Sequence, residues 1–380
     1  MKNVFEIVDH TDCCGCSSCS HICGNNAIQM KADSRGFMYP TVDMDICVNC
    51  GACVKVCPEI DYVSLKRNNI GVYGIQNLDK EIKEQSTSGG LFSLLANYVL
   101  SLNGTIYGAV YDAEGIKHVR VTDDYCSLRG SKYSQSEIDG IIDLLIDDLN
   151  KGKYVLFTGT PCQCAGVRKI LNHLNVSMSN LLLVDIICHG VVSPQILRDY
   201  IEYAEQAAGK RIIVHKFRDK VSGWSTYIET NIFEDGTEDR ESYESQLFKR
   251  IFLSHFGFRE ACFNCKFSTE KRVSDITMGD FWGLKNTRPE LWNDEGISLA
   301  IVYTNNGQKV IDNVIVNAEV FNASLSDTRQ PQLKMPALKP NHYDDFWIDY
   351  NNIGFSKIVK KYFHGGKMRR LASELIKKLQ

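Results

Sequence analysis

The sequence predicts a mixed α/β protein with a cysteine-rich domain over residues 1–67, a larger domain over 68–340 and a helical tail over 341–380. Nine of the fifteen cysteines lie between Cys13 and Cys57, which marks the first domain. Beyond it, apolar runs typical of strands alternate with amphipathic helical patterns, as in α/β architectures. The tail is basic, and its apolar residues recur at helical spacing.

The composition is that of a globular protein: 44% of the residues are hydrophobic, 23% are charged, and the net charge is −3. So weak a charge argues against nucleic-acid binding. No apolar run has the length of a membrane helix, and the N-terminal residues lack an apolar signal core, so we expect no transmembrane segment and a cytoplasmic location. In such a chain, clustered cysteines indicate metal binding or redox work rather than disulfides.

Two cysteine runs share the spacing C-x2-C-x2-C-x3-C, and the second is followed by Pro58. This is the pattern of bacterial two-cluster ferredoxins, in which the fourth cysteine of each run ligates the cluster of the other run. We therefore expect two 4Fe-4S clusters. The first would be held by Cys13, Cys16, Cys19 and Cys57. The second would be held by Cys47, Cys50, Cys53 and Cys23.

Two residues depart from this pattern. Gly24 stands where a proline is expected after Cys23, and Cys14 is an extra thiol that competes with Cys13 as a ligand. The alternative is structural zinc, which favours two separated cysteine pairs around a tetrahedral site. Eight cysteines in two four-member runs fit zinc poorly, so the pattern favours iron–sulfur clusters.

The larger domain is expected to hold a mixed sheet covered by helices. Helices are expected over 89–104, 136–152, 165–174 and 193–209, strands over 105–112, 118–122, 153–159, 181–190, 211–219 and 224–236, and a strand, turn and helix over 296–315. Ser136 and Ser193 are expected N-caps, Pro194 suits a first helical position, and Gly209 suits the end of its helix.

Four of the remaining cysteines lie where the sheet brings loops together. Cys162 follows one apolar strand and Cys188 ends the next, at the carboxyl ends where α/β sheets bind ligands. Cys262 and Cys265 form a C-x2-C pair. Together the four thiols suit a third cluster. Alternatively, the first two are small core residues and the pair is separate or half of a zinc site. The other two cysteines are expected to be structural: Cys126 and Cys164.

Two loops suit a phosphate or a ring system. "STSGG", residues 86–90, opens a helix, where backbone N–H groups and the positive end of the helix dipole attract phosphate; an ordinary Ser/Thr cap is the alternative. "GSKYSQS", residues 130–136, supplies Lys132, Tyr133 and Gln135 beside another helix start, or forms a solvated loop.

Taken together, these stretches resemble the family of coenzyme F-420 (deazaflavin) hydrogenase/dehydrogenase beta subunits with an N-terminal two-cluster ferredoxin domain. The matching pieces follow the family's order: "STSGGLFSLLANYVLSLNGTIYGAVYD", "GSKYSQS", "FTGTPCQCAGVRKIL", "CHGVVSPQIL", "FRDKVSGWS" and "CFNCKFSTEKRVSDITMGDFWG". The most distinctive are "TPCQ" and "DITMGDFWG". The family usually has an apolar residue where Cys164 stands, which leaves open which thiol of that loop is a ligand.

The resemblance implies a flavin-binding α/β domain that holds FAD, with an iron–sulfur cluster close to the flavin. On this basis the FAD diphosphate would contact Thr87, Ser88, Gly89 and Gly90. The flavin pocket would be lined by Lys132, Tyr133 and Gln135. A third 4Fe-4S cluster would be held by Cys162, Cys188, Cys262 and Cys265.

These parts predict an iron–sulfur flavoprotein oxidoreductase, because clusters pass single electrons whereas a flavin also exchanges hydride. A ferredoxin-like carrier or a partner redox subunit would exchange electrons with the clusters, and the flavin would exchange hydride with a small redox substrate. The alternative is a non-catalytic electron-transfer subunit that feeds a partner enzyme. Family members act on the deazaflavin coenzyme, on a chlorophyll intermediate or in connection with surface polysaccharides, and the residues do not choose among these.

Few residues suggest acid–base catalysis. His189, beside Cys188, is a candidate for moving protons, with a buried hydrogen-bonded histidine as the alternative. Further candidates for orienting ligands or stacking on a ring are Asp275, Asp280, Trp224 and Trp282. The basic tail suits an acidic partner or an anionic membrane surface, with a solvated helix as the alternative.

Overall fold

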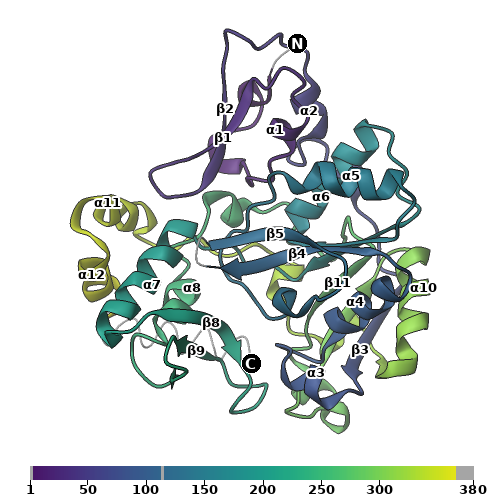
Figure 1. The fold of residues 1–380 in the computed structure, drawn as a ribbon, viewed down its shortest axis with the longest axis vertical. Helices are drawn as coiled ribbons and strands as arrows, with labels where there is room; N and C mark the ends of the chain where they lie inside the picture. The colour runs from purple at the N-terminus through teal and green to yellow at the C-terminus, as the bar shows by residue number, and fades with distance from the viewer. Residues whose placement is uncertain (1–2, 113–114, 365–380) are drawn as a thin grey trace.

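The computed structural model describes residues 3–112 and 115–364, and its N-terminal domain consists of two cysteine loops, two short helices and a hairpin. Its elements are α1 (Ser18–His21), β1 (Ile28–Ala32), β2 (Met38–Val42) and α2 (Ala52–Val56). The hairpin strands are antiparallel. Each helix begins after a left-handed residue, Ser17 or Gly51, which turns the preceding cysteine loop sharply. This domain lies beside two helices of the larger domain, α5 (Ile141–Asn150) and α6 (Pro161–His173) (Figure 1).

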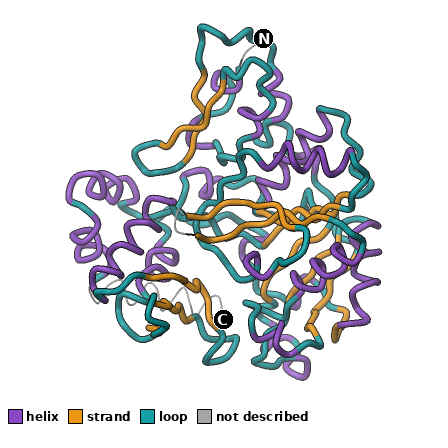
Figure 2. The backbone as a smooth tube through the Cα atoms, viewed as in Figure 1, coloured by secondary structure: helices purple, strands orange, loops and turns teal. Residues whose placement is uncertain are grey.

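An eight-stranded mixed sheet forms the centre of the larger domain, in the order β13-β3-β12-β11-β7-β6-β4-β5, which confirms the predicted mixed sheet (Figure 2). Its strands are β3 (Gly71–Asn77), β4 (Thr105–Asp112), β5 (Gly115–Val121), β6 (Val155–Gly159), β7 (Leu181–Ile186), β11 (Ile276–Asp280), β12 (Ser298–Val302) and β13 (Ala318–Asn322). The central strands β4, β6, β7 and β11 are parallel, and the flanking strands are antiparallel.

Helices cover both faces of this sheet because its central strands are apolar on both sides. In β6, Val155 and Phe157 join the core beneath α5 (Ile141–Asn150) and α6 (Pro161–His173). The intervening Leu156 joins the core beneath α4 (Leu91–Ser101) and α10 (Asn305–Val314). This alternation follows from the two-residue period of a strand.

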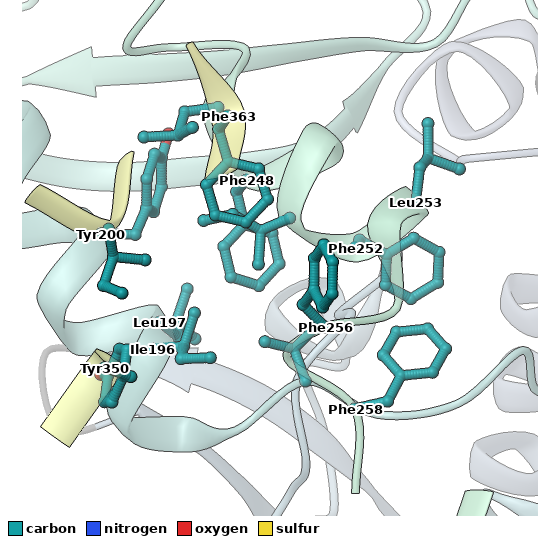
Figure 3. Close-up of a cluster of buried hydrophobic side chains, with 14 of the residues drawn as sticks. Ile196, Leu197, Tyr200, Phe248, Phe252, Leu253, Phe256, Phe258, Tyr350 and Phe363 are labelled. Carbon is teal, nitrogen blue, oxygen red and sulfur yellow. The ribbon is translucent and has the colours of Figure 1, made fainter. Parts of the chain in front are cut away.

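A second lobe packs helices against a small sheet. Its members are α7 (Pro194–Ala208), β8 (Ile212–Asp219), β9 (Ile228–Phe233), β10 (Glu238–Asp239), α8 (Leu247–Ser254), α11 (Tyr343–Ile353) and α12 (Phe355–Ile358). Their core is rich in aromatic rings, among them Phe248 and Phe252 of α8, as Figure 3 shows. Two further short helices complete the chain's regular elements: α3 (Lys80–Glu84) and α9 (Leu284–Thr287).

The predicted ends of α7 are confirmed. Ser193 Oγ accepts a hydrogen bond from the backbone N–H of Gln195 at 3.1 Å, and Pro194 is the first helical residue. Gly209 ends the helix in the left-handed conformation, with φ of 66°.

The predicted N-cap at Ser136 is wrong. Helix α5 begins after Gly140, which is left-handed with φ of 76°. The Ser136 hydroxyl instead accepts a hydrogen bond from Gln163 Nε2 at 3.0 Å. The apolar pattern identified the helix, but a tertiary contact with α6 occupies the serine that resembled a cap.

The C-terminus of the described chain is helical, as expected. It consists of α11, α12 and a π-helical turn over Val359–Phe363. The rest of the predicted basic tail, 365–380, lies outside the described residues. Within the ranges that the structure describes, no helix has both the length and the apolar character needed to cross a membrane.

A buried carboxylate ties α5 to the sheet. Asp148 is 1% exposed and accepts hydrogen bonds from Arg120 Nε and from the Tyr107 hydroxyl, both at 2.7 Å. We predict that Asp148→Ala lowers the free energy of unfolding by about 3 kcal/mol, because it leaves the guanidinium and the phenol without their partner. The measurement is anaerobic urea unfolding of the intact protein.

Asp147→Ala is the matched control for that substitution. Asp147 neighbours Asp148 on α5 but is exposed, and it pairs with Lys151 across one helical turn. Such a surface pair contributes about 0.5 kcal/mol or less. Equal losses in the two variants would contradict the assignment of a structural role to the buried carboxylate.

Candidate redox centre and cavity

The carboxyl edge of the central strands carries the first two candidate ligands. Strand β6 leads through Thr160 into α6, whose second residue is Cys162, and Cys188 follows the end of β7. The turn is fixed by a capping box in which the Thr160 backbone N–H donates to Gln163 Oε1 at 3.0 Å. Because β6 and β7 are parallel neighbours, both cysteines emerge at one edge.

Two further cysteines reach this edge at η5, the 3₁₀ helix Glu260–Asn264: Cys262 lies within it and Cys265 directly follows it. Burial raises the pKa of Cys262 well above its usual range, and the nearby charges of Cys188, Cys265 and Cys162 raise it further. Burial, followed by the charge of Cys162, raises the pKa of Cys188 to about 12. Such mutual influence requires short separations. The structure therefore brings together all four cysteines of the expected third cluster.

The first N-terminal set also comes together. Cys13, Cys16 and Cys19 of the first run line one small cavity with Cys57 of the second run. Burial raises the pKa of Cys19, and the other three thiols add to the shift. Four thiols that converge from two runs have the chemistry expected of ligands for a 4Fe-4S cluster.

The second N-terminal set lies nearer the surface. Cys23 and Cys53 belong to one apolar cluster, whereas Cys50 is exposed and Cys47 is partly exposed. Burial raises the pKa of Cys53, and the neighbouring Cys50 contributes to that increase. A cluster held by this set would be the one closer to solvent.

The three remaining cysteines, Cys14, Cys164 and Cys126, have different surroundings. Hydrogen bonds to Cys16 and Cys162 raise the pKa of Cys14, so its thiol lies between the first N-terminal set and the expected third set. Cys164 is buried beneath the sheet, with its Sγ 3.6 Å from the carbonyl oxygen of Val184. Cys126 is exposed.

The N-terminal domain contacts α6 directly. A Cβ added at Gly166 would lie 2.5 Å from Ser18 Oγ and 3.2 Å from Cys16 Sγ, so only a glycine allows this approach. The Lys169 ammonium, one turn further along α6, donates to the carbonyl oxygen of Cys57 at 3.0 Å. The helix that carries Cys162 thus also positions the first cysteine set.

A cavity of about 330 Å³ lies on the other side of Cys188. Its walls come from the carboxyl edge of the sheet, the loops over 86–90 and 130–136, and the second lobe. Cys188 and His189 form part of its lining. A volume above 300 Å³ is typical of a site for a cofactor or substrate.

The loop over 86–90 forms one end of this cavity. Thr87, Ser88 and Gly90 line it, and Gly90 is the N-cap of α4 without a side-chain cap bond, so the Ser/Thr cap alternative is wrong. Gly89 lies behind the wall, where a Cβ would approach the carbonyl oxygen of Ile75 to 2.2 Å. The positive end of the α4 dipole lies at this end of the cavity, where the N–H groups of Gly89 and Leu91 donate to Ser298 Oγ at 3.0 and 3.4 Å.

The second loop divides its residues between two places. Lys132 and Tyr133 line the cavity, and burial lowers the pKa of Lys132 to about 7. Gln135 is directed elsewhere: it donates to the carbonyl oxygen of Cys14 at 3.3 Å and accepts from Arg259 at 3.0 Å. The structure therefore places Gln135 at the contact between the domains and not in the flavin pocket that the resemblance implied.

The opposite wall contains an arginine held by an aspartate. Arg218 donates to Asp280 Oδ2 at 2.5 Å and lies over the Trp282 ring, 4.7 Å from its centroid. Trp282 stacks on Trp224, whose Nε1 donates to the same aspartate at 2.7 Å. Nearby, burial lowers the pKa of His189 to about 4, so its imidazole is neutral at pH 7.

The wall also contains a polar atom in need of a partner. His118 is buried, and its Nε2 lies 2.9 Å from the carbonyl oxygen of Thr158. Its Nδ1 is buried and has no hydrogen-bond partner among the residues that the structure describes. An orphaned polar atom beside a cavity fits a site that a polar ligand completes. Asp275, by contrast, is structural, because it accepts from Leu183 N and Thr304 Oγ1 at 2.8 Å.

Sequence reasoning missed four residues of this region: Gly166, Arg218, Arg259 and His118. Gly166 had a usable signal, because a glycine inside a predicted helix often marks a close approach. The other three had none that distinguishes them from surface cations or core histidines. Across 3–112 and 115–364, no three His, Cys, Asp or Glu side chains are arranged to hold a single metal ion.

Two regions of the chain match known families. Residues 152–327 match the family described as coenzyme F420 hydrogenase/dehydrogenase, C terminus of the beta subunit. Residues 12–59 match the 4Fe-4S dicluster domain. The second match supports the iron–sulfur clusters that the cysteine runs predicted.

Relatives of the chain are redox proteins. A subunit of the F(420)H(2) dehydrogenase of Methanosarcina mazei is 22% identical over 214 residues, which cover 52% of this chain and 59% of that protein. The coenzyme F420-dependent sulfite reductase of Methanocaldococcus jannaschii is 26% identical over 174 residues, covering 43% of this chain and 26% of that protein. The chain thus spans less than two thirds of the length of either relative.

A solved structure is also similar. A chain of the F420-reducing NiFe hydrogenase complex from Methanosarcina barkeri matches with a TM-score of 0.44 and 18% identity. The match covers 83% of this chain and 91% of that chain.

The contact at Gly166 generates a prediction. Gly166→Ala should accelerate the loss of iron–sulfur absorbance in air about tenfold, because a methyl group against Cys16 costs about 1.4 kcal/mol of docking free energy, within the range for overpacking. The helix itself would gain from alanine, so helix propensity cannot cause the loss. Gly24→Ala is the control, because nothing lies within 4 Å of a Cβ there. Equal rates for the two variants would contradict the packing argument.

Proposed function

Because the chain belongs to the family of coenzyme F420 hydrogenase/dehydrogenase beta subunits and carries a 4Fe-4S dicluster domain, we propose that it is an iron–sulfur flavoprotein oxidoreductase. It moves electrons between a one-electron carrier, or a partner redox subunit, and FAD. The cavity would hold FAD beside a small redox substrate, and the flavin would supply the chemistry of hydride exchange. Two N-terminal clusters and a third, inner cluster connect the surface to the cavity.

One observation carries this proposal: Cys188 belongs both to the four-cysteine set and to the wall of the cavity. A cluster held by Cys162, Cys188, Cys262 and Cys265 would therefore border whatever occupies the cavity. Adjacent one-electron and two-electron sites are what an enzyme needs to convert one kind of electron transfer into the other. Neither a zinc site nor a ferredoxin alone requires this arrangement.

The cysteine sets also form an ordered series. Cys50 of the second set is exposed, which suits exchange with a carrier. The first set lies against α6, where Gly166 allows Cys16 to approach. Cys14 lies between Cys16 and Cys162 and thereby links the first set to the inner set. The order from surface to cavity is the second set, the first set and the inner set.

The residues of the cavity suit FAD. A diphosphate would lie at the loop over 86–90, where the start of α4, Arg129 and Lys132 supply N–H groups and positive charge. Tyr133 lines the cavity and offers an aromatic surface for a ring system. When bound, FAD supplies the chemistry of hydride transfer next to single-electron transfer.

The chain's own residues would prepare the site for a substrate. Asp280 fixes the Arg218 guanidinium by a 2.5 Å hydrogen bond, so the cation needs no reorganisation when a substrate arrives. The neutral imidazole of His189 lines the same cavity and offers one donor and one acceptor. The substrate class that the relatives' names suggest is the deazaflavin coenzyme, which would then be reduced or oxidised beside the flavin.

A second function is an electron-transfer subunit that feeds a separate catalytic partner. The relatives favour it in one respect, since the chain covers only part of each and one of them is named as a subunit. Under this function the cavity would bind flavin but reject small substrates. The boundaries at 67 and 340 and the cytoplasmic location stay predictions.

Cofactor analysis tests the proposal. We expect about twelve iron atoms, about twelve acid-labile sulfides and one FAD per anaerobically purified chain. Two four-iron clusters without flavin would leave an electron-transfer module and refute the enzyme. Zinc without sulfide would refute both functions.

The inner cluster can be tested by one substitution and its neighbour. Cys162→Ser should lower the iron content by about four atoms per chain while the FAD content is kept, because a cluster that loses one thiolate is assembled poorly. Cys164→Ser is the matched control on the same helix, since Cys164 is a core residue. Loss of iron only in the Cys164 variant would assign the ligand to that thiol instead.

The diphosphate end of the cavity gives another test. Gly89→Ala should weaken FAD binding about tenfold, because the added Cβ meets the carbonyl oxygen of Ile75 and displaces the loop at a cost of about 1.4 kcal/mol. The readout is the flavin retained after dialysis against a series of FAD concentrations. Ser101→Ala, at the other end of α4, should retain flavin as the native protein does. Unchanged binding in Gly89→Ala would place the flavin elsewhere.

A further inference from the structure

Arg259 is a buried cation whose backbone is fixed beside the N-terminal domain. The residue is 1% exposed and directly precedes η5. Its N–H donates to the carbonyl oxygen of Val191 at 3.1 Å, and the preceding Phe258 bridges to Val192. This anchoring by the loop after β7 leaves the side chain little freedom, so its guanidinium has a defined position.

The guanidinium enters the first cysteine loop. Its Nε donates to the carbonyl oxygen of Cys13 at 2.7 Å, and its Nη2 lies 3.7 Å from the Cys13 Sγ. Nη1 donates to Gln135 Oε1 at 3.0 Å, and Nη2 also donates to the carbonyl oxygen of Met38. The guanidinium carbon lies over the Tyr39 ring, 3.9 Å from its centroid.

The positive charge of Arg259 is not paired with the carboxylate that follows it in the chain. Glu260 follows it in sequence but pairs with Arg35 at 3.2 Å and with Lys339 at 3.1 Å. The oxygen atoms that Arg259 binds belong to carbonyl groups and to an amide, which are neutral. Among the cysteines, its charge therefore acts most strongly on Cys13, and it also acts on Cys14 and Cys262.

We infer that Arg259 raises the reduction potential of the first cluster above that of the second and so draws electrons inward. The inference rests on the proposed function in one respect, the assignment of Cys13 as a ligand of the first cluster. Reduction adds one electron, so the cluster with its four thiolates changes from two negative charges to three. A buried cation and a hydrogen bond to a ligand sulfur both favour the more negative state.

At the second cysteine set the donor to the Cys23 sulfur is instead a neutral group, the backbone N–H of Ala27, at 3.3 Å. Cys50 is exposed, so solvent screens charges around it. The Cys47 Sγ lies 3.8 Å from the side-chain oxygen of Asn49, which is also neutral. Electrons from a carrier would therefore enter at the second cluster and rest on the first, one step closer to the cavity.

A redox titration of the intact anaerobic protein, followed by electron paramagnetic resonance, tests the inference. The first cluster is identified as the signal lost in Cys13→Ser. In Arg259→Gln we expect the one-electron equilibrium of that cluster to shift at least about tenfold toward the oxidised form, a decrease of about 59 mV. The second cluster should be unchanged and serves as an internal reference. Arg259→Lys, which keeps the charge, should show a smaller decrease.

Two further variants separate potential from folding. Gln135→Glu places a carboxylate at the atom that Arg259 now binds, so the first cluster should shift in the same direction without loss of the arginine. Arg288→Gln removes an arginine outside the contact between the domains, which pairs with Glu290 at 2.7 Å, and should leave both potentials unchanged. If Arg259→Gln loses iron, the potential of the first cluster in Gln135→Glu decides whether the inference holds.

The outcomes are distinct. A first-cluster potential that stays constant in both Arg259→Gln and Gln135→Glu overturns the inference, as does a Cys13→Ser protein that keeps both N-terminal signals. Absence of FAD or of the inner cluster would refute the proposed function while the difference between the two N-terminal potentials could still be measured. A merely structural arginine would alter iron content or stability and leave the potentials alone.

Discussion

The rest of the structure depends on the close approach of the N-terminal cysteine loop to the first turns of α6. Gly166 makes this possible, because any side chain there would collide with Ser18 and Cys16. The same helix begins at the carboxyl edge of the sheet and carries Cys162 in its first turn. One helix therefore determines both where the N-terminal domain docks and where the inner cysteine set begins, and Cys14 fills the space between them.

The sheet topology supplies the second half of this arrangement. Four parallel strands end at one edge, so loops from distant parts of the sequence meet there without long connections. Cys188 depends most on this geometry, since it leaves β7 between the cysteine set and the cavity. Antiparallel strands flank this core, so the loops of the parallel strands stay together at the centre of that edge.

Much of the fold and of the cysteine sites was predictable from the sequence, because the signals that specify them are local. The spacing of the cysteines specifies cluster ligands, and the apolar runs before Cys162 and Cys188 specify strand ends. The cap at Ser136 and the placement of Gln135 failed because tertiary contacts with Gln163 and Arg259 decide them. Local patterns carry no information about which distant residue will occupy a hydrogen-bonding group.

The phosphate end of the cavity contains a lysine, Lys132, whose positive charge depends on pH and on the bound group. Lys132 donates to the carbonyl oxygens of Ser127, Leu128 and Arg129, which are neutral, so no carboxylate cancels its charge. Burial lowers its pKa to about 7, which leaves the ammonium group only partly protonated at neutral pH. An anionic group bound beside it would raise that pKa again and draw in a proton. Anion binding at this end should therefore strengthen as the pH falls through 7, whereas a site built on a surface lysine would respond only near pH 10.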